Sequence, residues 1–367
     1  MTRARTNANV TAAVGRNMII NGAMNVAQRS ASVTGVGASG YFTCDRWKIG
    51  TDSSAGRFTM SQTADGPNGI SANCLKLDCT TADTSIAAGE NLLIQQRFEG
   101  QNLQRIGKGV AGAKQITLSF YVKASAGFTF GAELSDTDNG RQITKLYDTT
   151  TDWVRHELTY PADVDDGSSP FGDDNARSLD INFWLHAGTT YTGGTLNTAS
   201  FANNTDANRA VGIDSFYSST DNNFFITGVQ MEVGPVATEF EQEDIGTTLE
   251  KCKRYYRRIG NTGDASTLQM LFSGYLATAT RVFGSLMLSP SMRTQPTMGT
   301  TGTAADYQIL NLNQSTACSA VPAMDGQSSE QTIFLFVDTG TSLTAGGGVE
   351  IRGADEVTAH IAFDAEL

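Results

Sequence analysis

The sequence predicts an all-β fold: a jelly-roll-like antiparallel β-sandwich, a short linking helix and a smaller C-terminal β-sandwich domain. Short apolar runs with period-two alternation recur along the chain, and turn residues separate them. Only 17% of the residues are charged, and Gly is common whereas Pro is scarce (38 and 7 residues). This composition suits many short strands joined by polar loops. No amphipathic helices intervene between the strand candidates, which favours an antiparallel sandwich.

Residues 1–25 are interpreted as a basic arm. No acidic residue occurs from Met1 to Cys44, although the chain as a whole has a net charge of −12. The arginines of this region are Arg3, Arg5, Arg16 and Arg29. A basic arm on an acidic body suggests docking to an acidic partner. A solvated terminus without structure is the alternative.

Residues 26–243 are predicted to form the first sandwich. Its strand candidates include CLKLDC, NLLIQQRFEG, QITLSFYVKAS, FTFGAEL, WVRHELTY, LDINFWLHAG and FFITGVQMEV. In the third of these, Ile116, Leu118, Phe120 and Val122 are expected on one face. The last runs from Phe224 with regular alternation, and Gly234-Pro235 ends it.

Residues 244–259 are predicted to be a linking helix, with helical pattern to residue 258. Ile245, Leu249, Cys252 and Tyr256 form one apolar stripe at helical spacing. Acidic residues precede the helix and basic residues follow, which is the charge order that a helix dipole favours. The stripe must pack either on its own sandwich or on sister chains, because a helix of about three turns is marginal alone.

Residues 260–367 are predicted to form the smaller β domain. No lysine occurs after Lys253. The strand candidates are LQMLFSGYLAT, RVFGSLMLS, TIFLFVDTG and VTAHIAFDAEL, and SPSMRTQPTM is a proline-bounded loop. We find no fixed-period repeat, which disfavours a solenoid or a propeller.

The sequence carries few residues in catalytic patterns. The three histidines form no metal-binding motif, and no nucleophile elbow, P-loop or dinucleotide fingerprint is present. The chain is therefore expected not to be an enzyme. Five cysteines without paired spacing indicate buried free thiols. The acidic charge disfavours nucleic acid as a partner, and no signal peptide or membrane span is expected.

Two groups of residues are candidate binding sites. Tyr191 is a candidate glycan platform because it is an aromatic residue in a Gly/Thr-rich loop, and Trp153 and Trp184 are weighed with it against core packing. The acidic loop PADVDDGSSPFGDDN carries Asp163, Asp165, Asp166, Asp173 and Asp174. These carboxylates could hold Ca²⁺, which takes six to eight oxygen ligands; a solvated acidic loop is the alternative. No other cofactor is expected.

Three motifs resemble a group of phage tail-fibre and virion appendage proteins. NMIINGAMNVAQRS followed by DRW resembles their opening, FFITGVQMEVGPVATEFE followed by LEKCKRYY resembles their central element, and LSPSMRTQPT resembles part of their C-terminal module. The sequence departs from the family pattern at Glu239, where a proline is common. The motifs are specific as a set and leave residues 50–220 uncovered.

The resemblance implies a carbohydrate-binding-like jelly roll, a β tip module and a homotrimer on a virion. We expect a non-enzymatic tail fibre or related appendage, assembled in the host cytoplasm. Its arginine-bearing arm would join other virion proteins, and its β domains would bind a host-surface glycan or envelope receptor. A capsid fibre or decoration protein and a glycan depolymerase are the alternatives.

Overall fold

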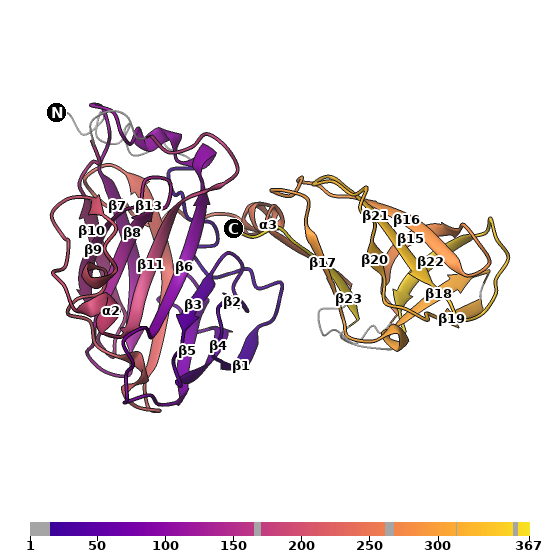
Figure 1. The fold of residues 1–367 in the computed structure, drawn as a ribbon, viewed down its shortest axis with the longest axis horizontal. Helices are drawn as coiled ribbons and strands as arrows, with labels where there is room; N and C mark the ends of the chain where they lie inside the picture. The colour runs from indigo at the N-terminus through magenta and orange to yellow at the C-terminus, as the bar shows by residue number, and fades with distance from the viewer. Residues whose placement is uncertain (1–14, 165–169, 261–267, 313, 355–358) are drawn as a thin grey trace. The chain divides into compact units, whose positions relative to one another are not determined.

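The computed structural model describes residues 15–164, 170–260, 268–312, 314–354 and 359–367. The chain divides into two compact units. The N-terminal unit comprises residues 1–248 with Leu367, and the C-terminal unit comprises residues 249–366. Both consist of antiparallel β-sheets, so the predicted all-β fold is confirmed (Figure 1).

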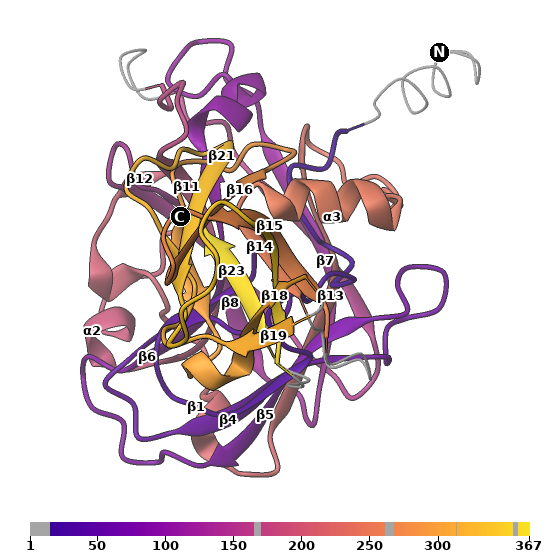
Figure 2. The ribbon, with the colours of Figure 1, turned by 90° about the vertical axis from the view of Figure 1, so that its right-hand side faces the viewer.

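The N-terminal unit contains two sheets. One has the order β1 (Ser32–Val36), β4 (Arg57–Thr63), β5 (Cys74–Thr81), β13 (Asn223–Val233), β7 (Ile116–Ala124) and β10 (Val154–Tyr160). The other has the order β12 (Ala202–Asn203), β9 (Arg141–Asp148), β8 (Thr129–Asp136), β11 (Arg177–Ala187), β6 (Asn91–Glu99), β3 (Lys48–Asp52) and β2 (Gly40–Tyr41). Figure 2 shows β1, β4 and β5 side by side.

A single apolar core joins these two sheets. The predicted inward row of Ile116, Leu118, Phe120 and Val122 is confirmed, since all four are buried in this core. Phe120 of one sheet meets Phe183 of the other edge to face, with ring centroids 5.0 Å apart. Such aromatic packing between alternating inward rows defines a β-sandwich.

Short helical segments join the strands of the N-terminal unit. They are η1 (Gly100–Asn102), η2 (Gln104–Ile106), α2 (Thr189–Thr192), η3 (Asp206–Asn208) and η4 (Phe216–Ser218). Tyr191, expected in a loop, lies in α2.

The C-terminal unit is the smaller sandwich that the sequence predicted. Its three-stranded sheet has the order β14 (Tyr256–Gly260), β23 (His360–Asp364), β17 (Thr297–Thr300). Its seven-stranded sheet has the order β19 (Gln314–Ala317), β18 (Tyr307–Asn311), β22 (Gly348–Gly353), β15 (Met270–Leu276), β16 (Arg281–Met287), β21 (Thr332–Asp338) and β20 (Ala323–Met324). The 3₁₀ turn η5 (Ala304–Asp306) precedes β18. Residues of both sheets share one core.

Strand β13 departs from the regular alternation that the sequence predicts. Its register with β7 shifts between Thr227 and Gln230, and Gly228 has a φ of +59°. This β-bulge moves the inward phase by one residue. Phe224 and Ile226 therefore point into the core before it, and Val229 and Met231 after it.

The predicted arm of residues 1–25 is wrong for its described part. Met18, Ile19 and Met24 are buried in the sandwich core. The backbone N–H of Met18 donates to the carbonyl of Met231 (2.9 Å), and that of Val229 donates to the carbonyl of Gly22 (3.0 Å). Residues 17–22, which we call the edge segment, thus bond to β13 beyond its bulge.

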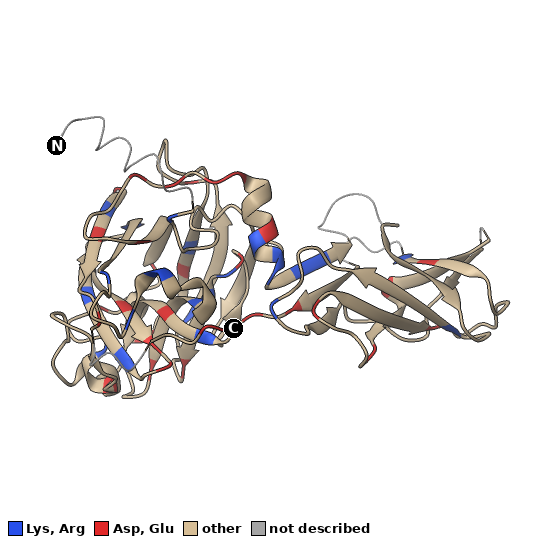
Figure 3. Cartoon of the chain, turned by 90° about the horizontal axis from the view of Figure 1, so that it is seen from above, with Lys and Arg blue, Asp and Glu red and all other residues tan. Residues whose placement is uncertain are grey.

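The predicted linking helix is shorter than expected. Helix α3 (Ile245–Lys253) ends before Arg254, and Tyr256 begins strand β14. The expectation of helix to residue 258 is wrong because the β14 residues pair with β23 instead. Along the proposed inter-subunit stripe, Ile245 is 53% exposed, Leu249 is half-buried and Cys252 is fully buried. Acidic and basic residues both mark α3 (Figure 3).

All five cysteines are free and buried, which confirms the prediction of buried thiols. Burial raises the pKa of the Cys318 thiol to about 12 and that of Cys44 further. No helix in the described part of the chain is long and apolar enough to cross a membrane.

Candidate functional site

Carboxylates at the end of β13 and between β13 and α3 accept hydrogen bonds from backbone N–H groups. Glu241 accepts hydrogen bonds from the backbone N–H groups of Gly15 (2.7 Å) and Asn17 (2.9 Å). Glu232 accepts from the backbone N–H of Thr238 (2.8 Å). Asp244 accepts from the backbone N–H of Gly246 (2.8 Å) at the start of α3. Helix capping thus explains only part of the acidic run, and the N-terminal residues engage Glu241.

The arginines expected to anchor the protein fall into two groups. Arg3 and Arg5 lie outside the described residues. Arg16 donates to the carbonyl of Glu239 (3.0 Å), and Arg29 lies over the ring of Tyr41 (5.1 Å). The two described arginines therefore make contacts within the N-terminal unit.

Residues 188–214 form a strap over the outer face of β11 and β8. The Trp184 side chain, on β11, is 1% exposed and packs with Leu93 and Ala210. The ring of Tyr191 lies 5.2 Å from that of Trp184, and Tyr191 is half-buried. Because the strap covers Trp184, a glycan cannot reach this predicted platform residue without displacing the strap. Tyr191 alone of this pair keeps an accessible edge.

A buried carboxylate holds the strap in place. Glu133, on β8, is fully buried and accepts hydrogen bonds from Asn182 (2.8 Å), Trp184 Nε1 (2.9 Å) and Arg209. Burial lowers the pKa of Arg209, but the charge and hydrogen bonds of Glu133 outweigh burial and raise it overall. The Arg209 guanidinium also lies over the Trp184 ring at 5.0 Å. This charged pair is a structural clasp between strap and sheet.

The third predicted glycan residue, Trp153, lies on the other sheet. It immediately precedes β10 and is half-buried, and its ring is 6.3 Å from that of Phe225 on β13. Lys123 lies over both rings, at 5.2 Å from Trp153 and 4.7 Å from Phe225. Lys76 lies on β5, on the other side of β13 from Lys123, and its ammonium group is 5.5 Å from the Phe225 ring.

We call this surface the Trp153 face, and it consists of Lys76, Tyr121, Lys123, Trp153, Arg155 and Phe225. Cross-strand pairing brings Phe225 opposite both Lys76 and Lys123, and Arg155 opposite Tyr121. The Trp153 indole N–H donates to the carbonyl of Asp65 (3.1 Å), which fixes the ring orientation. The face therefore presents aromatic rings beside cationic hydrogen-bond donors. The structure thus separates Trp153 from Trp184, which lies on β11 of the other sheet, and from Tyr191 in α2, which packs against Trp184.

The structure describes only part of the aspartate group that could hold Ca²⁺. Asp163 is 7% exposed, and its carboxylate accepts two hydrogen bonds of 2.9 Å from Arg141. Asp173 and Asp174 are exposed, and Asp174 accepts from the backbone N–H of Ala176 (2.9 Å). Asp165 and Asp166 lie outside the described residues. Within the described ranges, no three His, Cys, Asp or Glu residues are grouped to hold a metal.

His186 links a hydroxyl and a carboxylate. Its Nδ1 lies 2.8 Å from Ser215 Oγ and its Nε2 lies 3.2 Å from Glu90. Burial lowers the pKa of His186, and the contact with Glu90 partly offsets this. In serine hydrolases the carboxylate meets Nδ1 and the serine meets Nε2; here the order is reversed. Ser215 Oγ also accepts from the backbone of Tyr217, so the trio fixes η4 against β11.

Sequence reasoning missed a surface of the C-terminal unit. On β15, β16 and β21 the outward positions carry Tyr275, Phe283, Phe334 and Phe336. Tyr275 is 55% exposed and Phe334 is 44% exposed. The signal was available in TIFLFVD, because aromatic residues occupy the phase opposite to Ile333, Leu335 and Val337, which are buried.

Comparisons with known proteins give no family. No protein-family model and no curated protein matches the chain. Among solved structures, one titled for CBM4 structure and function is 13% identical with a TM-score of 0.30, covering 58% of this chain and 97% of that one. TmCBM61 in complex with β-1,4-galactotriose is 11% identical with a TM-score of 0.28, covering 60% and 99%.

A family 11 carbohydrate-binding module from Clostridium thermocellum, in complex with a mixed-linked tetrasaccharide, is 12% identical with a TM-score of 0.27. The match covers 57% of this chain and 99% of that module. TM-scores this low do not establish a common fold or function.

Proposed function

We propose that this chain is a bacteriophage virion protein, a tail fibre or related appendage, that binds a host-surface glycan without cleaving it. The Trp153 face is the observation that carries the binding proposal. The half-buried rings of Trp153 and Phe225 on the outer side of this sheet present apolar surface for the C–H faces of a sugar. Lys76 and Lys123 are paired with Asp78 (3.1 Å) and Asp65 (2.7 Å), and the remaining N–H donors of each ammonium group can bind hydroxyl oxygens of the sugar.

The virion assignment rests on the three sequence motifs together. Residues 17–30 of the first motif form the edge segment and its continuation, and residues 224–241 of the second hold that segment. Two motifs far apart in sequence thus form one structural joint, which supports treating them as a set. The proposal includes a homotrimer, with the exposed Ile245 end of α3 as a contact between copies.

The proposed anchoring to other virion proteins falls on residues 1–14 with Arg3 and Arg5. Arg16 and Arg29 already make internal contacts. Gold labelling of intact particles tests the assignment directly. Label on the tail supports a tail appendage, label on the head supports a capsid fibre or decoration protein, and its absence from the particle contradicts the virion role.

Binding of the full chain to immobilised host-envelope polysaccharide tests the glycan role. Trp153→Ala should weaken binding about tenfold, which corresponds to about 1.4 kcal/mol. Leu146→Ala, which removes an apolar side chain of 37% exposure, is the control and should leave affinity unchanged. Loss of binding in EDTA would support Ca²⁺ as a ligand of the acidic loop, and unchanged binding would support the solvated loop.

The same incubation distinguishes binding from cleavage. New reducing ends formed at enzyme-like rates would replace the binding proposal with a depolymerase. Equal affinity of Trp153→Ala and the unmodified protein would remove the Trp153 face from the proposal.

A further inference from the structure

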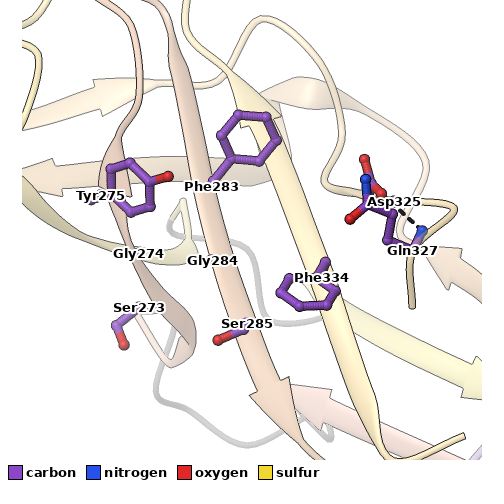
Figure 4. A pocket seen from close by; sticks show the side chains of 9 residues that line it. All are labelled: Ser273, Gly274, Tyr275, Phe283, Gly284, Ser285, Asp325, Gln327 and Phe334. Carbon is purple, nitrogen blue, oxygen red and sulfur yellow. Dashed lines mark hydrogen bonds between the residues drawn. The ribbon is translucent and has the colours of Figure 1, made fainter. Parts of the chain in front are cut away.

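The C-terminal unit has a hollow on the outer face of its seven-stranded sheet. Its volume is about 450 Å³, within the roughly 300–1,000 Å³ typical of small-ligand sites. It is lined by Ser273, Gly274, Tyr275, Phe283, Gly284, Ser285, Asp325, Gln327 and Phe334 (Figure 4). All nine residues belong to the described part of one unit.

The strand register explains why a hollow forms on a sheet. Gly274 pairs with Gly284, and the next pair along the strands is Tyr275 with Phe283. On the other side of the glycine pair, Ser273 and Ser285 occupy the outward positions, and Ser285 pairs with Phe334. The small serine side chains thus lie next to the Tyr275 and Phe283 rings along the strands, and Phe334 lies beside Ser285, as Figure 4 shows. The serines form a polar floor and the rings form its walls.

The aromatic rings at the hollow are exposed to water, which is unfavourable for apolar surface. Tyr275 and Phe334 are 55% and 44% exposed, whereas Ile333 and Leu335 on the inward phase of β21 are fully buried. Exposed aromatic side chains gathered in one place mark a binding surface. Three neighbouring strands, about 5 Å apart, give the row of rings a span of roughly 10 Å.

The rim of the hollow is polar and is held by β21. The backbone N–H of Asp325 donates to the carbonyl of Phe334 (2.9 Å), and that of Phe334 donates to Ser328 Oγ (3.0 Å). These bonds fasten the loop at residues 325–328 to the strand. One carboxylate oxygen of Asp325 accepts from the backbone N–H of Gln327 (2.9 Å). The rim therefore offers a carboxylate acceptor, held by the backbone N–H of Gln327, and the exposed side-chain amide of Gln327.

The lining contains no cationic side chain. Arg281, which lies over the Phe336 ring at 5.1 Å, is held by Asp338 through two hydrogen bonds of 2.7 Å. An acidic ligand would thus meet the Asp325 carboxylate without a free countercharge. Aromatic walls, hydroxyl floor and a carboxylate–amide rim fit a neutral polyhydroxylated ring.

We propose that this hollow binds a neutral hexose of a glycan, which stacks on Tyr275 or Phe334 and hydrogen-bonds to Asp325 and Gln327. The proposal rests on the proposed glycan-binding function and adds a second location and a sugar class to it. A second copy of this chain is the competing occupant. The polar floor and the concave shape favour the sugar, because an interface between copies is apolar at its centre.

Titration calorimetry of the full chain with lactose, cellobiose and mannobiose, and with a glucuronic-acid disaccharide, tests the proposal. At least one neutral disaccharide should bind, and the acidic one should bind more weakly. Tyr275→Ala and Phe334→Ala should each reduce the affinity about tenfold or more. Asp325→Asn, which keeps the shape of the side chain, should also reduce it.

Met270→Ala is the matched control. It removes a side chain of 56% exposure on the same strand as Tyr275 but outside the hollow, and affinity should stay within about twofold. Thermal unfolding checks that each variant is folded.

Absence of binding by all neutral disaccharides overturns the proposal, as does equal affinity in the three hollow variants. Sedimentation velocity separates the competing occupant: a change of oligomeric mass in Tyr275→Ala with sugar affinity unchanged assigns the face to contacts between copies. Failure of Trp153→Ala to affect polysaccharide binding contradicts only the Trp153 face. Failure of Tyr275→Ala and Phe334→Ala contradicts only the hollow.

Discussion

Replacing Arg209 by alanine should destabilise the N-terminal unit strongly. Arg209 Nε and Nη2 lie 2.9 and 3.0 Å from the two carboxylate oxygens of Glu133. The Glu133 side chain is fully buried and that of Arg209 is 17% exposed. Arg209→Ala leaves the carboxylate with Asn182 and Trp184 as donors but without a countercharge.

The magnitude follows from the burial of the pair. Removing one partner of a buried ion pair costs about 3–5 kcal/mol. For a unit of this size, each kcal/mol lowers Tm by roughly 2–4 °C, so a decrease of about 6–20 °C is expected. Lys76→Ala breaks the 3.1 Å pair with Asp78, whose side chains are 26% and 46% exposed, and should cost at most about 1 kcal/mol.

The double variant Glu133→Gln/Arg209→Met separates charge from packing. It removes both charges and keeps most of the volume, so it should recover much of the loss. Urea unfolding gives the free energies, and hydrogen exchange of residues 188–214 should rise selectively in Arg209→Ala. Equal losses in Arg209→Ala and Lys76→Ala, or no recovery in the double variant, would refute the clasp.

Three further changes test other parts of the N-terminal unit by urea unfolding. Gly228→Ala should lower the free energy of unfolding by more than the about 1–2 kcal/mol that left-handed backbone strain costs, because the new Cβ would also lie 2.8 Å from Ile70 and Tyr121. Gly35 has a φ of +66° and open space around it, so Gly35→Ala should show the cost of the strain alone. Asn17→Ala should lower the free energy of unfolding by about 1–3 kcal/mol and increase hydrogen exchange at residues 17–22, because Asn17 Oδ1 accepts hydrogen bonds from the backbone N–H groups of Met231 and Ile19. Asn203→Ala, at an exposed position, is the control and should change neither quantity. Burial lowers the pKa values of His156 and His186, so the unfolded chain binds more protons below its His pKa of about 6.5. The contribution of these histidines to stability should therefore be complete above that pH and decline as pH falls through their folded pKa values. The decline should be smaller in the double variant His156→Gln/His186→Gln. A rise in stability from pH 7.5 to 5.5 would contradict this assignment.

The alternation of apolar and polar residues predicted most of the strands. The prediction of inward-facing residues was wrong where a bulge shifts the alternation by one residue. QITLSFYVKAS has strict period two, and its inward row is confirmed. FFITGVQMEV reads as equally regular, but Gly228 adopts a left-handed conformation and inserts a bulge. The sequence does not show which sign of φ a glycine adopts, because glycine populates positive and negative φ about equally readily.

The helix and the arm failed for a different reason. Tyr256 fits the helical stripe, yet long-range pairing with β23 places it in a strand. Residues 17–22 have no periodic pattern, and only the vacant edge of β13 beyond its bulge explains their burial. Neither partner can be seen from local sequence, because tertiary contacts override local preference.

The sequence predicted which types of residue form the candidate sites better than it predicted where those residues lie in the fold. Trp153 was proposed as an aromatic platform and is half-buried, but Trp184 was grouped with it although a strap covers it. The strap contacts depend on Arg209 and Glu133, which are 76 residues apart in sequence. The hollow in the C-terminal unit depends on which residues of three strands stand in register, and such pairing is not a property of any one strand.

The bond between the edge segment and β13 also constrains when the chain can fold during synthesis. Asn17 and Met231 are bonded across 214 residues. At about 5–20 residues per second, the ribosome needs roughly 10–40 s to add that length. Throughout that time Met18 and Ile19 lack the strand that buries them, and β5 and β7, once synthesised, each have an edge that β13 has not yet paired. Chaperone binding to the N-terminal unit of the nascent chain should therefore fall sharply when β13 emerges.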